Sequence, residues 1–90
     1  MIHRIITENK NYEQTAQLVS EHFGGFTIIT ATNYRQGRPE HSLVIEICPD
    51  AKAGDGETRT QIDKLAYAIK KQNGQQAVMV QRIACQNDIV

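Results

Sequence analysis

The segment that most constrains this fold runs from Phe26 to Cys48 and predicts two long β-strands joined by a turn. The turn is expected at Tyr34–Pro39, because that stretch is charged and contains Gly37. Each strand has about nine residues and would span about 30 Å. Both faces of this hairpin carry apolar side chains, and a small domain on its own covers only one of them. We therefore expect the second face to meet another chain.

The composition excludes several classes of protein. Ninety residues, 40% of them hydrophobic, suit one small globular domain. No apolar run approaches the roughly 20 residues of a membrane helix, and the N-terminus has no signal core, which predicts a cytoplasmic protein without membrane contact. Ten basic and ten acidic residues cancel, which disfavours nucleic acid as a partner. Cys48 and Cys85 lack metal-site spacing, so we expect no metal, no cofactor and two reduced strand cysteines packed as small apolar residues.

The segment before the hairpin predicts a strand and a helix. Ile2–Thr7 is rich in isoleucine and reads as a short strand. Asn11 is a suitable helix N-cap, and Gln14 stands three residues later, as in a capping box. Apolar residues then recur at helical spacing until Gly24 and Gly25, which are expected to end the helix in the left-handed conformation.

The segment after the hairpin predicts a loop, a helix and a last strand. The loop is Pro49–Glu57, and Thr58 or Thr60 is expected to cap the helix that follows. Gly74 should end this helix, and Gln75 is a candidate partner for the end of the sheet. The apolar stripe of the helix consists of Ile62, Leu65, Ala66 and Ile69, and the last strand is expected at Ala77–Ala84.

The resulting order, β-α-β-β-α-β, predicts a single ferredoxin-like α+β domain over residues 1–90. Its four-stranded antiparallel sheet would have the first and third strands at the centre and both helices on one face. The central hairpin is long enough for its tip to project beyond the core as a two-stranded arm.

The sheet face without helices is predicted to be an interface. We assign Thr27, Ile29, Ala31, Leu43, Ile45 and Ile47 to the helix-covered face. The open face then carries the interface candidates Phe26, Ile28, Val44 and Cys48. An apolar patch of this kind favours a homodimer or higher oligomer packed sheet to sheet. The alternative is a half-solvated sheet whose β-branched residues reflect only strand propensity.

The tip of the hairpin is the predicted ligand site. Its candidates are Tyr34, Arg35, Arg38, Glu40 and Ser42, with Asn33 and His41 beside them. Arginine forks bind phosphate or carboxylate, and a tyrosine ring can stack on a base, so this set suits a small anionic ligand such as a nucleotide. The alternative is an ordinary solvated, charged hairpin tip.

Catalytic and RNA-binding functions receive less support. Glu40 and His41 are neighbours on a strand and point to opposite faces, so they do not form an acid–base pair. The chain has no nucleophile elbow, P-loop or metal motif. Neither expected central strand contains the aromatic residues on which RNA-recognition sheets stack bases. A small enzyme of the dimeric α/β-barrel type, acting through His41, remains an alternative.

Short motifs along the chain resemble those of a group of small uncharacterised bacterial and phage proteins. The motifs are Gly25-Phe26-Thr27, then Gly37, Glu40-x-Ser42 and Gly74-Gln75 before a valine-rich strand. That group often carries an aromatic residue directly before glycine in the hairpin, whereas here Arg35 and Gln36 separate Tyr34 from Gly37. The resemblance implies no established activity.

These observations predict a non-enzymatic, oligomeric binding protein. By analogy with compact phage proteins that counter bacterial immunity, it would be a phage-encoded anti-defence protein that sequesters a small anionic, nucleotide-type signal. The main alternative is a protein-interaction module, or inhibitor, that docks through the open sheet face.

Overall fold

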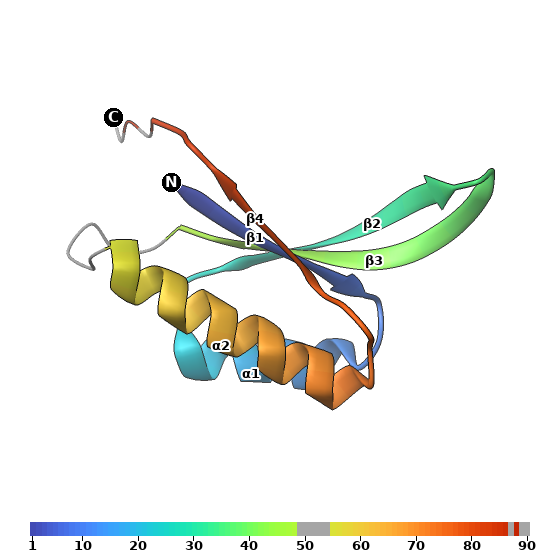
Figure 1. The fold of residues 1–90 in the computed structure, drawn as a ribbon, viewed down its shortest axis with the longest axis horizontal. Helices are drawn as coiled ribbons and strands as arrows, with labels where there is room; N and C mark the ends of the chain where they lie inside the picture. The colour runs from blue at the N-terminus through green and yellow to red at the C-terminus, as the bar shows by residue number, and fades with distance from the viewer. Residues whose placement is uncertain (49–54, 87, 89–90) are drawn as a thin grey trace.

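The computed structural model describes residues 1–48, 55–86 and 88. They form six elements in the predicted order, with both helices on one side of the sheet (Figure 1). The predicted loop at Pro49–Glu57 lies largely outside the described residues, and its last three residues belong to a helix. The elements are β1 (Ile2–Glu8), α1 (Tyr12–His22), β2 (Thr27–Arg35), β3 (Arg38–Ile47), α2 (Asp55–Asn73) and β4 (Met79–Ile83).

The four strands form one antiparallel sheet in the order β2-β3-β1-β4, so β1 and β3 are central as expected. This α+β arrangement is compatible with the predicted ferredoxin-like class. Alternate residues of β1 and β3 point toward the helices, because side chains alternate along a strand. The core between sheet and helices contains Ile5, Val19, Ile45, Ile47, Ile62, Leu65, Ala66 and Ile69, which includes the whole predicted stripe of α2.

The turn of the hairpin is shorter than predicted. Only Gln36 (φ 53°) and Gly37 (φ 75°) lie between the strands, and both are left-handed, as in the type I′ turns that suit strand twist. The strands therefore reach further toward the tip, and the hairpin extends well beyond the helices as the predicted arm (Figure 1). The pairing of β1 with β3 ends at Ser42, so no strand lies beside Pro39 on the β1 side of β3. Proline is tolerated at such a position, where it has no partner strand to donate to.

The predicted facing of β2 is wrong. Ile28 lies opposite Ile45, and both Phe26 and Ile28 pack against the helix-covered core. Ile29 lies opposite Val44 on the open face, and Thr27 and Ala31 share that face. The two-residue turn is the cause, because it pairs each even-numbered residue of β2 with an odd-numbered residue of β3. Val44 has the predicted facing, and Cys48 lies exposed just beyond β3.

The two ends of α1 also differ from expectation. Asn11 precedes the helix, but it is left-handed (φ 52°) and its side chain makes no capping hydrogen bond, so the capping box with Gln14 does not form. After α1 the chain becomes extended at Phe23 (φ −135°), and Gly24 and Gly25 do not adopt positive φ. An extended residue ends this helix, so no left-handed glycine is needed there.

The end of α2 confirms the prediction for Gly74. This residue is left-handed (φ 63°), and its N–H donates to the Lys71 carbonyl at 3.3 Å. The N–H of Gln75 donates to the Lys70 carbonyl at 3.0 Å, which completes a Schellman motif. The start of α2 differs, because the helix begins at Asp55 and Thr58 is buried inside it rather than capping it.

The cysteine prediction is wrong in one respect. Cys48 and Cys85 are both exposed and lie just outside β3 and β4, so they are not packed as strand residues. Neither α1 nor the described part of α2 combines the length and the apolar character that crossing a membrane requires.

Candidate functional site

A cleft lies at the base of the arm, where β1 ends at Glu8 while β3 continues to Arg38. Its volume is about 780 Å³. Three parts of the chain line it: the end of β1 and the residues after it, the arm, and the segment that leads into β4. The polar lining residues are Thr7, Glu8, Asn9, Lys10, Asn33, Arg35, Glu40, His41, Ser42 and Gln75, and the apolar ones are Ile6, Ala77, Val78 and Met79.

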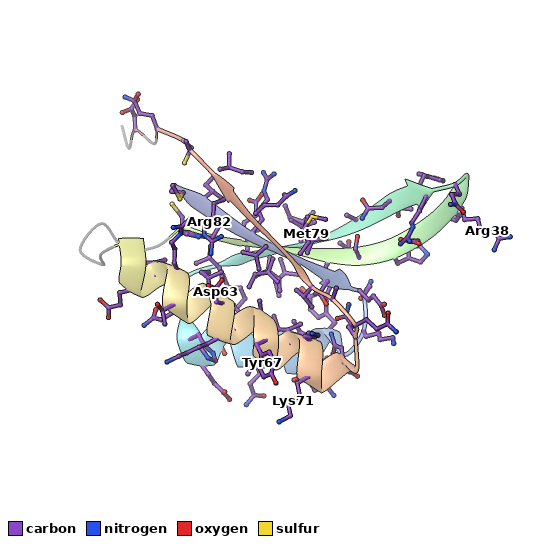
Figure 2. The ribbon with its side chains drawn as sticks, in the orientation of Figure 1. Arg38, Asp63, Tyr67, Lys71, Met79 and Arg82 are labelled. Atoms are coloured by element: carbon purple, nitrogen blue, oxygen red, sulfur yellow. The ribbon has the colours of Figure 1, made fainter. Side chains whose placement is uncertain are left out.

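Three of the five predicted ligand residues line this cleft, namely Arg35, Glu40 and Ser42. Arg38 lies opposite Arg35 across the hairpin and stands near the far end of the arm (Figure 2). Tyr34 alternates with Arg35 and so lies on the other face, where its side chain is 75% exposed. The structure therefore brings the arginine, the carboxylate and the hydroxyl together and leaves the tyrosine out.

Two side chains in the cleft, Ser42 and Gln75, use their oxygen atoms as hydrogen-bond acceptors within the protein and keep donor groups available. The buried Ser42 hydroxyl oxygen accepts from Asn33 Nδ2 at 2.9 Å, so its O–H remains available to donate. Gln75 Oε1 accepts from the hydroxyl of Thr7 and from Asn73 Nδ2 at 3.2 Å, which leaves the Gln75 amide N–H groups available. The ammonium of Lys10 and the guanidinium of Arg35 add positive charge to this set.

The charges around the cleft are only partly paired. Lys10 Nζ lies 3.2 Å from a carboxylate oxygen of Glu8, and both side chains are 56% exposed. Neither Arg35, Arg38 nor Glu40 forms an ion pair with another residue in the described part of the chain. Arg35 and Arg38 are like charges placed directly opposite each other on antiparallel strands, which is unfavourable unless an anion lies between them.

A network of polar side chains holds Gln75 in place. Asn11 Nδ2 donates to Asn73 Oδ1 at 3.1 Å, and Asn73 Nδ2 donates in turn to Gln75 Oε1. Gln72 Nε2 donates to Thr15 Oγ1 at 3.2 Å, which gives a second link between α2 and α1. Since Thr7 belongs to β1, Gln75 does bond the end of the sheet, which the sequence suggested only as an alternative to the helix-end role of Gly74.

Sequence reasoning missed Glu8 and Lys10 as cleft residues. They stand about 25 residues before the arm, and nothing in their local sequence marks them as a site. The signal was topological: the predicted fold places the first strand beside the third, so the residues after β1 must lie at the base of the arm.

The cleft does not contain a recognisable catalytic pair. His41 and Glu40 both line it, but they are successive residues of β3 and no hydrogen bond joins them. Among the described residues, no group of three histidine, cysteine, aspartate or glutamate side chains is placed to hold a metal ion. Comparison of the chain with models of known protein families and with curated proteins finds no match.

Proposed function

We propose that this protein is a non-enzymatic binding protein that holds a small anionic ligand of the nucleotide type in the cleft at the base of the arm. The observation that carries the proposal is the set of four donor side chains that line one cleft, Lys10, Arg35, Ser42 and Gln75. They come from three separate parts of a domain that we assign to the ferredoxin-like class, on the basis of its strand order.

The polar groups suit a nucleotide better than a simple inorganic anion. The Arg35 fork and the Lys10 ammonium match phosphate oxygens in geometry and charge. Glu40 lines the same cleft and forms no ion pair with another described residue, so it would accept from the hydroxyl of a sugar or the amino group of a base. Sequestration of a signalling nucleotide is the role we infer for such a site.

Isothermal titration calorimetry with linear and cyclic mononucleotides and dinucleotides tests this function. A charge-assisted hydrogen bond contributes about 1.5–3 kcal/mol, so Arg35→Ala should weaken binding about 10- to 100-fold. Arg59→Ala is the matched control, because it removes the same charge from an exposed position on α2. Absence of heat with every nucleotide, or equal affinity of the two variants, would refute the proposal.

A second candidate function is the docking of a protein partner on the open sheet face. One apolar row crosses all four strands there, since Ile29 pairs with Val44, Val44 with Ile6, and Ile6 with Met79. The side chains of Ile29 and Met79 are 44% and 56% exposed, and Figure 2 shows Met79 on the face turned away from the helices. Exposed apolar patches of this kind mark interaction surfaces.

The variant Met79→Asp tests this second function. It would place a charge in the apolar row, and it should abolish capture of a protein partner from cell extract. Tyr67→Asp is the control, because Tyr67 is 66% exposed on α2, on the helical side of the molecule (Figure 2). Equal capture by wild type and both variants would exclude the open face as the docking surface.

A further inference from the structure

The outer edge of β2 lacks the features that normally keep sheet edges from pairing. From Thr27 to Tyr34 the strand contains no charged residue and no proline, and its pairing with β3 runs without a bulge. The opposite edge strand, β4, has only five residues and includes Arg82. Natural proteins protect edges by shortness, charge, proline or bulges. Of the two edges, only β4 has such protection.

The free backbone groups of this edge can be identified from the pairing. The Asn9 N–H donates to the His41 carbonyl at 3.2 Å, so the odd-numbered residues of β3 direct their backbone groups away from β2. The residues of β2 opposite them must then direct their own groups outward. These residues are Ile28, Thr30, Thr32 and Tyr34, and no backbone hydrogen bond between described residues uses their outward groups.

We propose that β2 pairs antiparallel with β2 of a second copy of this chain, about a two-fold axis at Ala31. Ala31 is the middle residue of the strand Thr27–Arg35, so this register uses its whole length. Four residues with two backbone groups each would form about eight hydrogen bonds across the axis. The interface is isologous, as in most homodimers.

The side chains of β2 complement themselves in this register. Tyr34, whose side chain is 75% exposed in the single chain, lies beside Ile28 of the second copy. Thr30 lies beside Thr32 of the second copy. Aromatic residues beside β-branched ones, and threonine beside threonine, are favourable neighbours across strands. The pairing therefore covers the exposed tyrosine, which has no role in the cleft.

This dimer and the proposed ligand site use different groups of β2. The side chains of Asn33 and Arg35 line the cleft, whereas the free edge presents the outward backbone groups of Ile28, Thr30, Thr32 and Tyr34. A two-fold axis perpendicular to the sheet keeps both pairs of helices on one side, so the apolar row of the open face stays accessible. Loss of the dimer and loss of ligand binding can thus be measured separately.

Sedimentation velocity of the wild-type protein tests the proposal, and a dimer is expected. Thr30→Pro removes an outward N–H without breaking the ladder to β3, and it should give a folded monomer. Thr30→Lys places a charge on the edge without changing the backbone and should weaken dimerisation at least about tenfold. Gln61→Lys adds the same charge to an exposed position on α2 and should remain dimeric.

The register is tested with Ala31→Cys in a background in which Cys48→Ser and Cys85→Ser remove the native thiols. Two copies of residue 31 face each other at the axis with Cα atoms about 4.5 Å apart, within disulfide range. Oxidised glutathione should therefore link them into a covalent dimer. Ile29→Cys is the control, because its two copies are about 13 Å apart along the strand. A monomeric wild type, or equal linking of both variants, overturns the proposal.

Discussion

Replacement of Asn73 by alanine gives a direct test of the polar network behind the cleft. Asn73 is buried at the end of α2, with an exposed fraction of 8%. Its side-chain oxygen Oδ1 accepts from Asn11 Nδ2 at 3.1 Å, and its side-chain nitrogen Nδ2 donates to Gln75 Oε1 at 3.2 Å. A third contact, from Gln72 Nε2, is longer at 3.4 Å. Asn73→Ala therefore loses two well-formed hydrogen bonds, one to Asn11 before α1 and one to Gln75 two residues further along the chain.

The expected loss of stability follows from these contacts. Each net hydrogen bond contributes about 1 kcal/mol, so two bonds contribute about 2 kcal/mol. Asn11 is exposed and Gln75 half-exposed, so water can replace the lost partner and no buried group is left unsatisfied. Alanine favours the helix over asparagine by about 0.5 kcal/mol, which leaves a net loss of about 1.5 kcal/mol. The melting temperature should fall by about 6–12 °C.

Urea unfolding followed by circular dichroism measures this loss as a lower midpoint at an unchanged slope. Asn9→Ala is the control, because Asn9 is exposed and its side chain makes no hydrogen bond to another described residue. A double-mutant cycle with Asn11→Ala should give a coupling energy of about 0.5–1 kcal/mol between the two asparagines. Equal stability of Asn73→Ala and Asn9→Ala would refute the reasoning.

Two further predictions concern the left-handed residues. Gly74→Ala should lower the free energy of unfolding by about 1 kcal/mol, because φ is 63° and open space around the position leaves backbone strain as the only cost; urea titration checks this, and an unchanged midpoint would contradict it. Gln36→Asn should raise the free energy of unfolding by a few tenths of a kcal/mol, because Asn-Gly is the preferred type I′ pair and Gln36 has φ 53°; thermal melting checks this, and Gln36→Val should lower the melting temperature instead.

The elements and their order were predictable because they depend on local patterns. The apolar stripe of α2 repeats at helical spacing, and all four of its predicted residues are buried. The left-handed Gly74 follows from the chemistry of helix ends. The caps of α1 were not predictable in the same way, because the Asn11 side chain bonds to Asn73 on another helix instead of to its own helix terminus.

The site was predictable only in part. Glu40 and Ser42 share one face of β3 by alternation alone, whereas Arg35 of β2 joins them only because the two-residue turn places the odd-numbered residues of β2 on that face. Lys10 and Gln75 join them only because β1 ends beside the arm and because Asn73 and Thr7 orient the glutamine. Such contacts depend on where strands end relative to one another, which no local pattern encodes.

The sequence by itself determined that this chain has a long hairpin with apolar residues on both faces. The tertiary structure decided which face of β2 is buried, because Gln36 and Gly37 form a two-residue turn that places Ile28, and not Ile29, opposite Ile45. Gln-Gly is a weak sequence signal for that turn, whereas a shift of one residue moves every side chain of the strand to the other face. The same pairing left an uncharged edge at β2, and this edge could not be recognised before the strand order was known.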